Sequence, residues 1–265
     1  GNTISCTNYD VNSIGMVLSG NGDGVIEIDS NIVTQSWVGI QSQISGVGNN
    51  DLLRWNTMHD IRDIGFEMLG SGMRVESNRL YDVQGIGIKV SGMSHSISNN
   101  YIQVGGQGQA KGISLQSGGD GSKVLFNSVN ITGTDVVTGR ALELIGGNNY
   151  IISNNNFVNV GGGYAARFDV IPASIVLDYN CYYSPNRKLL STPTAQYNYL
   201  SDFVSAISKE SHGQQVNPYY TSYSNLHPNH VMLYHMGLSQ SEVSKDIEEN
   251  TRSVSPSIGA KEFGL

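Results

Sequence analysis

The sequence predicts an all-β protein: a right-handed parallel β-helix, wound as one solenoid over residues 1–183 and followed by a C-terminal cap, residues 184–265, with one short helix. Three features recur together along the coils. They are an Asn followed two residues later by an apolar residue, a short strand that contains a small residue, and an alternating strand just before each Asn. Stacked coils place the same position of each repeat directly above the last one, so a parallel coil keeps all three features in phase.

The Asn recurs at intervals of 22 to 28 residues, which sets the length of one coil. Side-chain amides stacked inside a bend can hydrogen-bond to one another and to the turn backbone, so the sequence predicts an internal Asn ladder. Tandem helices are excluded because no segment of the repeat holds a helical period for ten residues. The ladder positions are Asn31, Asn56, Asn78, Asn100, Asn127, Asn155 and Asn180.

The regular pattern stops after Asn180, and five of the six prolines follow residue 184. Four apolar residues then predict an amphipathic helix that begins near Ser201 and ends before Gly213. An open coil end exposes unpaired strand edges, so this helix and the aromatic tract Tyr219–Tyr223 are expected to cap it. No comparable cap precedes the first coil, so we expect a monomer or part of a longer chain. The four helix residues are Leu200, Phe203, Val204 and Ile207.

The composition argues against several classes of partner. The 265 residues carry a net charge of −7, whereas nucleic-acid binding needs a basic stripe. No run of eighteen apolar residues occurs, so no membrane span is predicted. Cys6 and Cys181 fall in the first and last coils, roughly 30 Å apart at about 4.8 Å per strand, which is too far for a disulfide.

Residues 3–183 resemble the parallel β-helix repeat family that pectate lyases, chondroitinase-B-like and alginate-lyase-like enzymes, and mannuronan epimerases share. The segment Gly87–Ile102 is typical of one such coil. Asp246–Arg252 and Ser257–Phe263 resemble the ending of many secreted or surface-anchored bacterial β-helix proteins, although Ser257 stands where those proteins usually have Asp. The resemblance implies an extracellular or bacterial cell-surface location. It specifies no reaction, because this fold carries enzymes and passive surface proteins alike.

An outward column of side chains is the first candidate site. Faces alternate along a strand, so the residue two positions after each small residue should point outward. The column reads Val17, Gln41, Glu67, Lys89, Ser114, Glu143 and Arg167. The small residues beside it, from Gly15 to Ala165, would form a smooth trough for a polysaccharide, as substrate lies along an outer sheet face in the resembled enzymes. The predicted substrate-binding residues are Gln41, Glu67, Ser114 and Glu143.

A structural interpretation of the same column competes with the functional one, and we favour it. Glu67 and Lys89 lie in successive coils, as do Glu143 and Arg167. Each pair would form a cross-strand ion pair worth less than about 1 kcal/mol. The small residues equally suit turn backbones that pack closely. Glu67 and Glu143 would be roughly 14 Å apart, too far for either geometry of glycosidase carboxylates, which disfavours hydrolysis at this face.

Two further cations stand out because they replace apolar residues. Lys111 and Arg140 take the position before the small residue, where earlier coils carry Ile or Val. Like charges stacked about 5 Å apart need a carboxylate or another anion between them, and Asp135 is a candidate counter-ion. A uronate lyase needs its substrate carboxylate neutralised, by calcium or Arg, and a base that removes the C5 proton. The candidates for these roles are Lys89, Lys111, Arg140 and Arg167.

No metal site is predicted from the residues, and calcium enters only as a candidate cofactor of a lyase. The segment 21–24, Asn-Gly-Asp-Gly, resembles part of a calcium loop but is more typical of a turn. His227, His230 and His235 would suit zinc only with a further ligand, which the sequence does not identify.

Two functional hypotheses remain. The first is a secreted carbohydrate-active β-helix that recognises an acidic polysaccharide, as a lyase, epimerase or hydrolase or as a binding domain. The second is a non-catalytic surface module, an adhesin-like rod or spacer of a larger protein. The low content of charged residues, 14%, favours the second hypothesis, whereas the resemblance and the basic residues favour the first. We lean towards polysaccharide recognition and leave catalysis open.

Overall fold

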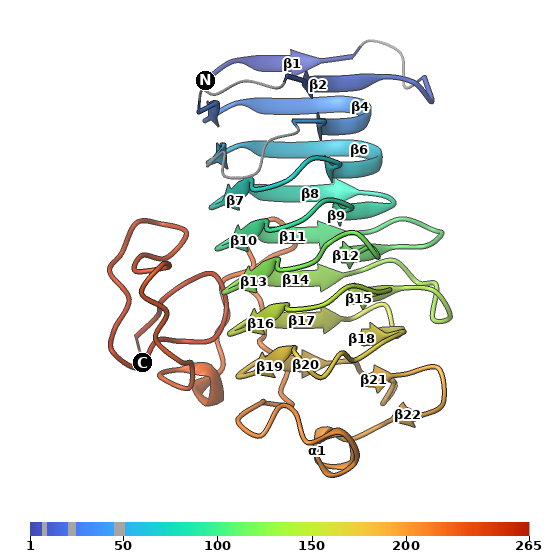
Figure 1. Cartoon of the computed structure of the whole chain (residues 1–265), viewed down its shortest axis with the longest axis vertical. Coiled ribbons are helices and arrows are strands. Elements are labelled where there is room, and N and C mark those ends of the chain that lie inside the picture. The colour runs from blue at the N-terminus through green and yellow to red at the C-terminus, as the bar shows by residue number, and fades with distance from the viewer. Residues whose placement is uncertain (7–9, 21–24, 45–50, 265) are drawn as a thin grey trace.

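The computed structural model describes residues 1–6, 10–20, 25–44 and 51–264 and shows a parallel β-solenoid, so the predicted β-helix is confirmed (Figure 1). The strands of each coil lie on three faces, which we call the short-strand sheet, the Asn-side face and the column face. β4 (Ile32–Ser42) and β6 (Thr57–Met68) run through the last two faces and join them into one 15-stranded sheet. The short-strand sheet is separate and has seven strands.

The strand bounds follow the repeat. The short-strand sheet contains β3 (Glu27–Asp29), β5 (Leu52–Arg54), β7 (Arg74–Glu76), β10 (Ser96–Ser98), β13 (Lys123–Leu125), β16 (Ile151–Ser153) and β19 (Val176–Asp178). Besides parts of β4 and β6, the Asn-side face contains β1 (Thr3–Ser5), β8 (Arg79–Val83), β11 (Tyr101–Val104), β14 (Ser128–Ile131), β17 (Asn156–Asn159) and β20 (Cys181–Tyr183). The column face contains β2 (Ile14–Leu18), the other parts of β4 and β6, β9 (Ile86–Val90), β12 (Lys111–Leu115), β15 (Arg140–Leu144), β18 (Tyr164–Phe168) and β21 (Leu190–Ser191). β21 pairs antiparallel with β22 (Gln196–Tyr197), and the helices are α1 (Leu200–Ile207) and the 3₁₀ helix η1 (Val231–Leu233).

The predicted Asn ladder is confirmed and lies in the bend between the short-strand sheet and the Asn-side face. The Nδ2 of Asn78 donates to Oδ1 of Asn100 at 3.0 Å, and the backbone N–H of Asn78 donates to the same oxygen at 3.0 Å. The same Nδ2 also donates to the carbonyl oxygen of Leu53 at 2.9 Å. Equivalent amide–amide bonds join each ladder Asn to the next, from Asn31 to Asn180. The ladder thus satisfies buried polar groups that the sheets leave unpaired.

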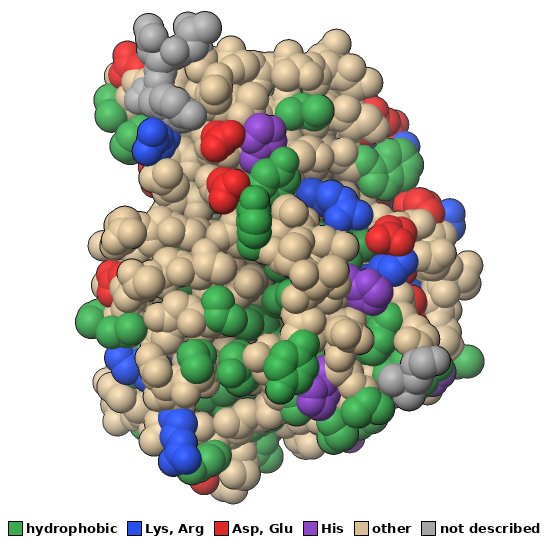
Figure 2. All heavy atoms as spheres, turned by 180° about the vertical axis from the view of Figure 1, so that it is seen from behind, with side chains coloured by type: hydrophobic (Ala, Val, Ile, Leu, Met, Phe, Trp, Pro, Cys, Tyr) green, Lys and Arg blue, Asp and Glu red, His purple; other side chains and the backbone are tan. Residues whose placement is uncertain are grey.

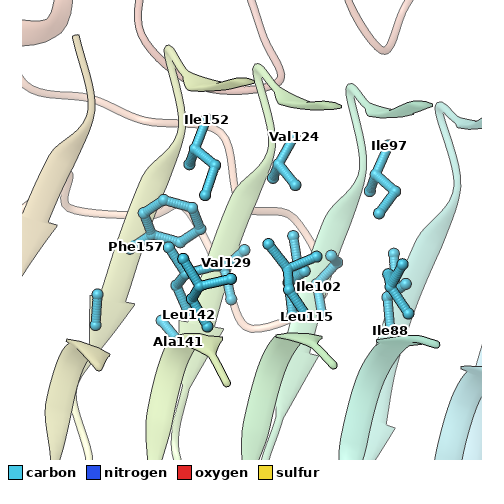
Figure 3. Packing of buried hydrophobic residues seen from close by; sticks show 14 of the residues in the cluster. Ile88, Ile97, Ile102, Leu115, Val124, Val129, Ala141, Leu142, Ile152 and Phe157 are labelled. Carbon is cyan, nitrogen blue, oxygen red and sulfur yellow. The ribbon is translucent and has the colours of Figure 1, made fainter. Parts of the chain in front are cut away.

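Apolar side chains fill the interior in stacked columns, which Figure 3 shows from close by. Residues from the short-strand sheet, such as Ile97 and Val124, face residues from the other two faces, such as Ile102 and Leu115. All four side chains are fully buried. Burying one such side chain stabilises the fold by about 1.5–3 kcal/mol, and each coil buries its interior against the next one.

The row of small residues belongs to this core, so the predicted surface trough is wrong. Gly39, Gly65 and Gly87 are buried. A Cβ added to Gly65 would lie 2.5 Å from the carbonyl oxygen of Gly87 and 2.6 Å from Cδ2 of Leu80. The missing side chain makes room for a core residue and for the backbone of the next coil. The competing interpretation, close packing of backbones at this bend, is the correct one.

Helix α1 closes the C-terminal end of the solenoid, within a residue of the predicted start (Figure 1). Phe203 is fully buried and stacks on Phe168 of β18, with 5.8 Å between the ring centroids. Tyr197 meets the Phe203 ring edge-on at 5.2 Å. The helix ends at Ser208, whose φ of 59° turns the chain out of the helix. The helical part of the predicted cap is therefore confirmed.

The chain after residue 215 lies along the side of the coils (Figure 1). Tyr220 packs against Tyr101 of β11, and Tyr223 meets the ring of Tyr81 of β8 edge-on at 6.5 Å. The tract Tyr219–Tyr223 therefore covers part of the Asn-side face. The prediction that this tract caps the open coil end is wrong, because its aromatic rings pack against strands in the middle of the solenoid.

Two further observations concern cysteines and membranes. Cys6 follows β1 and Cys181 begins β20, so both lie in the terminal coils, as predicted, and both are free thiols. Burial raises the pKa of the Cys181 thiol to about 12, which keeps it protonated at neutral pH. Within the described residues, no helix has the length and apolar character needed to cross a membrane.

Candidate functional site

The predicted outward column exists on the column face. Strand pairing sets each member beside the equivalent residue of the next coil: Glu67, for example, pairs with Gln41 on one side and Lys89 on the other. The same register continues to the last coils. The column therefore brings the four predicted substrate-binding residues into one row with two of the catalytic candidates. In order, the row reads Gln41, Glu67, Lys89, Ser114, Glu143 and Arg167.

Glu67 is the centre of the first half of the row. Gln41 Nε2 donates to Glu67 Oε2 at 2.7 Å, and Lys89 Nζ lies 2.9 Å from Glu67 Oε1. Burial raises the pKa of Glu67, but the hydrogen bonds from Gln41 and Lys89 outweigh it and hold that pKa below its ordinary value. The predicted cross-strand pair of Glu67 and Lys89 is therefore confirmed, and Glu67 is ionised at neutral pH.

Glu143 is the centre of the second half of the row and is the shared counter-ion of the two stacked cations. Lys111 pairs with Arg140 on neighbouring strands, as predicted. Lys111 Nζ lies 2.7 Å from Glu143 Oε2, and Arg140 Nη1 lies 3.1 Å from Glu143 Oε1. Ser114 Oγ donates to Oε2 at 2.8 Å. The Glu143 side chain is only 5% exposed, so the three groups form a buried cluster in which one carboxylate is shared by two cations.

This cluster corrects two expectations about counter-ions. Asp135 does not bridge the stacked cations: its carboxylate accepts bonds from the backbone of Val137 and from Thr138, within its own loop. Arg167 does not form an ion pair with Glu143 either, although strand pairing sets the two residues side by side. Arg167 Nε instead lies 2.6 Å from Oδ1 of Asp169, the residue that follows the end of β18. Burial lowers the pKa of Arg140, which nevertheless stays charged beside Glu143.

Trp37 and Asp63 form a second polar feature of this face that the sequence reasoning missed. Trp37 Nε1 donates to Asp63 Oδ2 at 3.1 Å. Burial raises the pKa of Asp63, against the bond from Trp37 and the charge of Lys89. A Cβ on Gly85 in the next coil would lie 2.6 Å from Asp63 Oδ1, so the carboxylate occupies space left by that glycine. The sequence signal was available: Asp63 stands two residues before the small residue of its repeat, where the next coil carries Gly85.

The remaining candidates give no metal site among the described residues. No three His, Cys, Asp or Glu side chains of the described chain lie close enough together to hold a metal ion. The Asn-Gly-Asp-Gly segment at 21–24 lies outside the described residues. Figure 2 shows one face of the molecule, on which charged side chains of both signs are scattered in small groups.

Comparison with known proteins does not place the chain in a family. No model of a known protein family matches it, and no curated protein matches it. The resemblance to polysaccharide-degrading β-helix enzymes therefore bears on function only as a proposal, to be weighed with the geometry of the column face.

Proposed function

We propose that the protein is an extracellular β-solenoid that recognises an acidic polysaccharide along its column face. The supporting observation is the unbroken polar row, which runs across six consecutive strands in register. Parallel strands repeat about every 4.8 Å, so the row offers one polar side chain per coil along a straight line. An extended polymer laid along the solenoid axis would meet the half-buried side chains of this row, namely Gln41, Glu67, Lys89 and Arg167, whereas Ser114 and Glu143 are buried.

Two cations of the row are the proposed contacts for carboxylates of the polymer. The side chains of Lys89 and Arg167 are 29% and 36% exposed, whereas those of Lys111 and Arg140 are only 14% and 10% exposed. Lys89 and Arg167 are three strands apart, which corresponds to about 14 Å. Each would exchange its present carboxylate partner for one on the polymer. Lys111 and Arg140 instead hold Glu143 and Ser114 in place.

Recognition fits this geometry better than cleavage. A base for β-elimination must take the C5 proton, and a free cation must neutralise the substrate carboxylate. All four predicted catalytic cations are bound to carboxylates: Lys89 to Glu67, Lys111 and Arg140 to Glu143, and Arg167 to Asp169. Recognition needs only that Lys89 and Arg167 exchange partners, whereas elimination also needs one group to lose its proton and act as the base. Lyase or epimerase activity is therefore the secondary proposal, and a purely structural surface module is the alternative.

A panel experiment tests the proposal. Pectate, alginate, chondroitin sulphate and hyaluronan are titrated into the protein by calorimetry, with and without calcium, and the mixtures are then followed for ultraviolet absorbance of unsaturated products. Saturable binding of at least one polymer without new absorbance is the expected result. New absorbance would move the assignment to a lyase. Absence of binding to every polymer would contradict recognition and favour the structural module.

A further inference from the structure

A cleft lies between the short-strand sheet and the C-terminal segment, on a different part of the molecule from the column face. It has two adjoining lobes, of about 460 and 170 Å³. Strands β5, β7, β10 and β13 form one wall of the cleft. Side chains from the segment 242–249 line the opposite wall. The larger lobe alone falls in the size range of small-molecule sites, about 300–1,000 Å³. Both lobes share Arg74, Glu76, Ser98 and Glu242.

The floor of the cleft presents hydroxyl groups that have no partner in the described protein. Ser94, Ser96 and Ser98 line the larger lobe. Ser98 as a residue is only 3% exposed, but its hydroxyl is not among the buried polar atoms without a partner, so it opens into the cleft. None of the three hydroxyls makes a hydrogen bond within the part of the chain that the structure describes. A hydroxyl that opens into a cleft can exchange its hydrogen bonds to water for hydrogen bonds to a bound ligand. Gly121 also lines this lobe.

The charges that line the cleft cancel. Arg74 Nη2 lies 2.8 Å from Glu76 Oε2, and Lys123 Nζ lies 2.6 Å from Glu242 Oε2. His95 adds no charge, because burial lowers its pKa to about 4. Over both lobes the basic and acidic side chains are equal in number. They are Arg54, Arg74, Lys123 and Lys245 against Glu76, Glu242, Asp246 and Glu249.

From this arrangement we propose that the cleft binds an uncharged, hydroxyl-rich ligand, namely a short neutral oligosaccharide. Free serine hydroxyls both donate and accept hydrogen bonds. The ion pairs at the rim also offer donors and acceptors, and they attract neither a positively nor a negatively charged ligand. A charged ligand would have to break one of the two ion pairs. The site is independent of the column face and does not rest on the function proposed for that face.

The test uses the whole protein and neutral probes. Maltotriose, cellotriose and chitotriose are titrated by calorimetry into the wild type and three variants. Ser96→Trp fills the larger lobe and is expected to abolish binding. Its control is Val176→Trp, at a 51% exposed position in the same row of the short-strand sheet but outside this cleft. Ser98→Ala removes only the hydroxyl of that residue and should weaken binding roughly threefold to tenfold.

The outcomes separate this proposal from the one for the column face. Binding of a neutral trisaccharide that Ser96→Trp abolishes, Ser98→Ala weakens and Val176→Trp leaves intact supports the cleft. The proposal is overturned if no neutral trisaccharide binds, or if Ser96→Trp and Ser98→Ala leave the affinity unchanged. Binding that is lost only on changing Lys89 or Arg167 would also overturn it and would assign the sugar to the column face.

Discussion

The Nδ2 of Asn180 donates a hydrogen bond of 2.6 Å to Oε1 of Glu210, which is the last acceptor of the Asn ladder. Tyr182 donates its hydroxyl to the same oxygen at 2.6 Å, and the backbone N–H of Asn180 donates to Oε2 at 3.2 Å. Glu210 lies just beyond helix α1 and is 1% exposed. One carboxyl group therefore connects the end of the ladder to the segment that closes the solenoid.

The first prediction concerns pH. Burial raises the pKa of Glu210 to about 8, against an ordinary value of 4.5. The folded state holds this proton more tightly than the unfolded state, so the stabilising effect is full below pH 4.5 and is lost as the pH rises through 8. The free energy of unfolding should fall over that interval by on the order of a few kcal/mol. Urea unfolding between about pH 5 and pH 9 covers most of this interval and about one unit beyond its upper end, and it measures the fall.

The matched variant for this prediction is Glu210→Gln, which cannot ionise. It should flatten the fall in the free energy of unfolding over the same pH range, although it gives up the weaker bond from the Asn180 backbone. An equal fall in wild type and variant would show that another group carries the pH dependence.

The second prediction tests the interior of the ladder. Asn127→Ala removes the acceptor of both Asn100 donors and the donor to the carbonyl oxygens of Ile97 and Leu125. Each buried polar group left without a partner costs about 1–3 kcal/mol, so the free energy of unfolding should fall by several kcal/mol. Asn229→Ala, at an exposed position, is the control and should change it by less than about 0.5 kcal/mol. Similar losses for both variants would count against a structural role of the ladder.

The third prediction concerns the inward row of small residues. Gly65→Ala would force a Cβ against the Gly87 carbonyl oxygen and the Leu80 side chain, at 2.5 and 2.6 Å. Overpacking of this kind costs about 1–3 kcal/mol, measurable as a lower urea midpoint. Gly20→Ala, where nothing lies within 4 Å of the added atom, is the comparison and should be close to neutral. If Gly65→Ala leaves the urea midpoint unchanged, the added methyl group is accommodated, and the interpretation of these residues as a surface trough would be valid again.

The fourth prediction concerns the buried cluster of the column face. Glu143→Gln leaves Lys111 and Arg140 stacked without their shared counter-ion, and breaking a buried pair in this way costs about 3–5 kcal/mol. Glu249→Gln breaks the exposed pair with Lys245 and should cost less than about 1 kcal/mol. Chemical denaturation compares the two. Equal small losses would mean that the cluster is not a structural unit.

The sequence was sufficient for the ladder and the column because both depend only on repeat phase. Asn78 meets Asn100, and Glu67 meets Lys89, as soon as the coils are stacked in register. The phase says nothing about which of several nearby groups a long side chain chooses. Repeat phase therefore did not predict that Arg167 pairs with Asp169 and not with Glu143.

The direction of the small residues escaped prediction because the strand bends there. Strand pairing joins Lys111 to Ile86 and Ile113 to Ile88 in one register but includes no pairing between Gly112 and Gly87. Simple alternation of faces fails at such a bend, so the glycine turns inward and the trough disappears. The packing of the C-terminal segment along the side of the coils was not predicted for a different reason. It depends on contacts between residues far apart in sequence, such as Tyr220 with Tyr101, and the repeat pattern carries no information about them.

The central claim, recognition of an acidic polysaccharide by the column face, is tested most directly by calorimetric titration of the polymer that the panel selects into Lys89→Gln, Arg167→Gln and the double variant. Arg187→Gln, an exposed cation near the C-terminal end of the solenoid, is the control. Loss of one charge-assisted contact, about 1.5–3 kcal/mol, should weaken binding roughly tenfold or more in each single variant and further in the double variant. The control should bind as the wild type does. Unchanged affinity in the double variant, or an equal loss in the control, would contradict the claim.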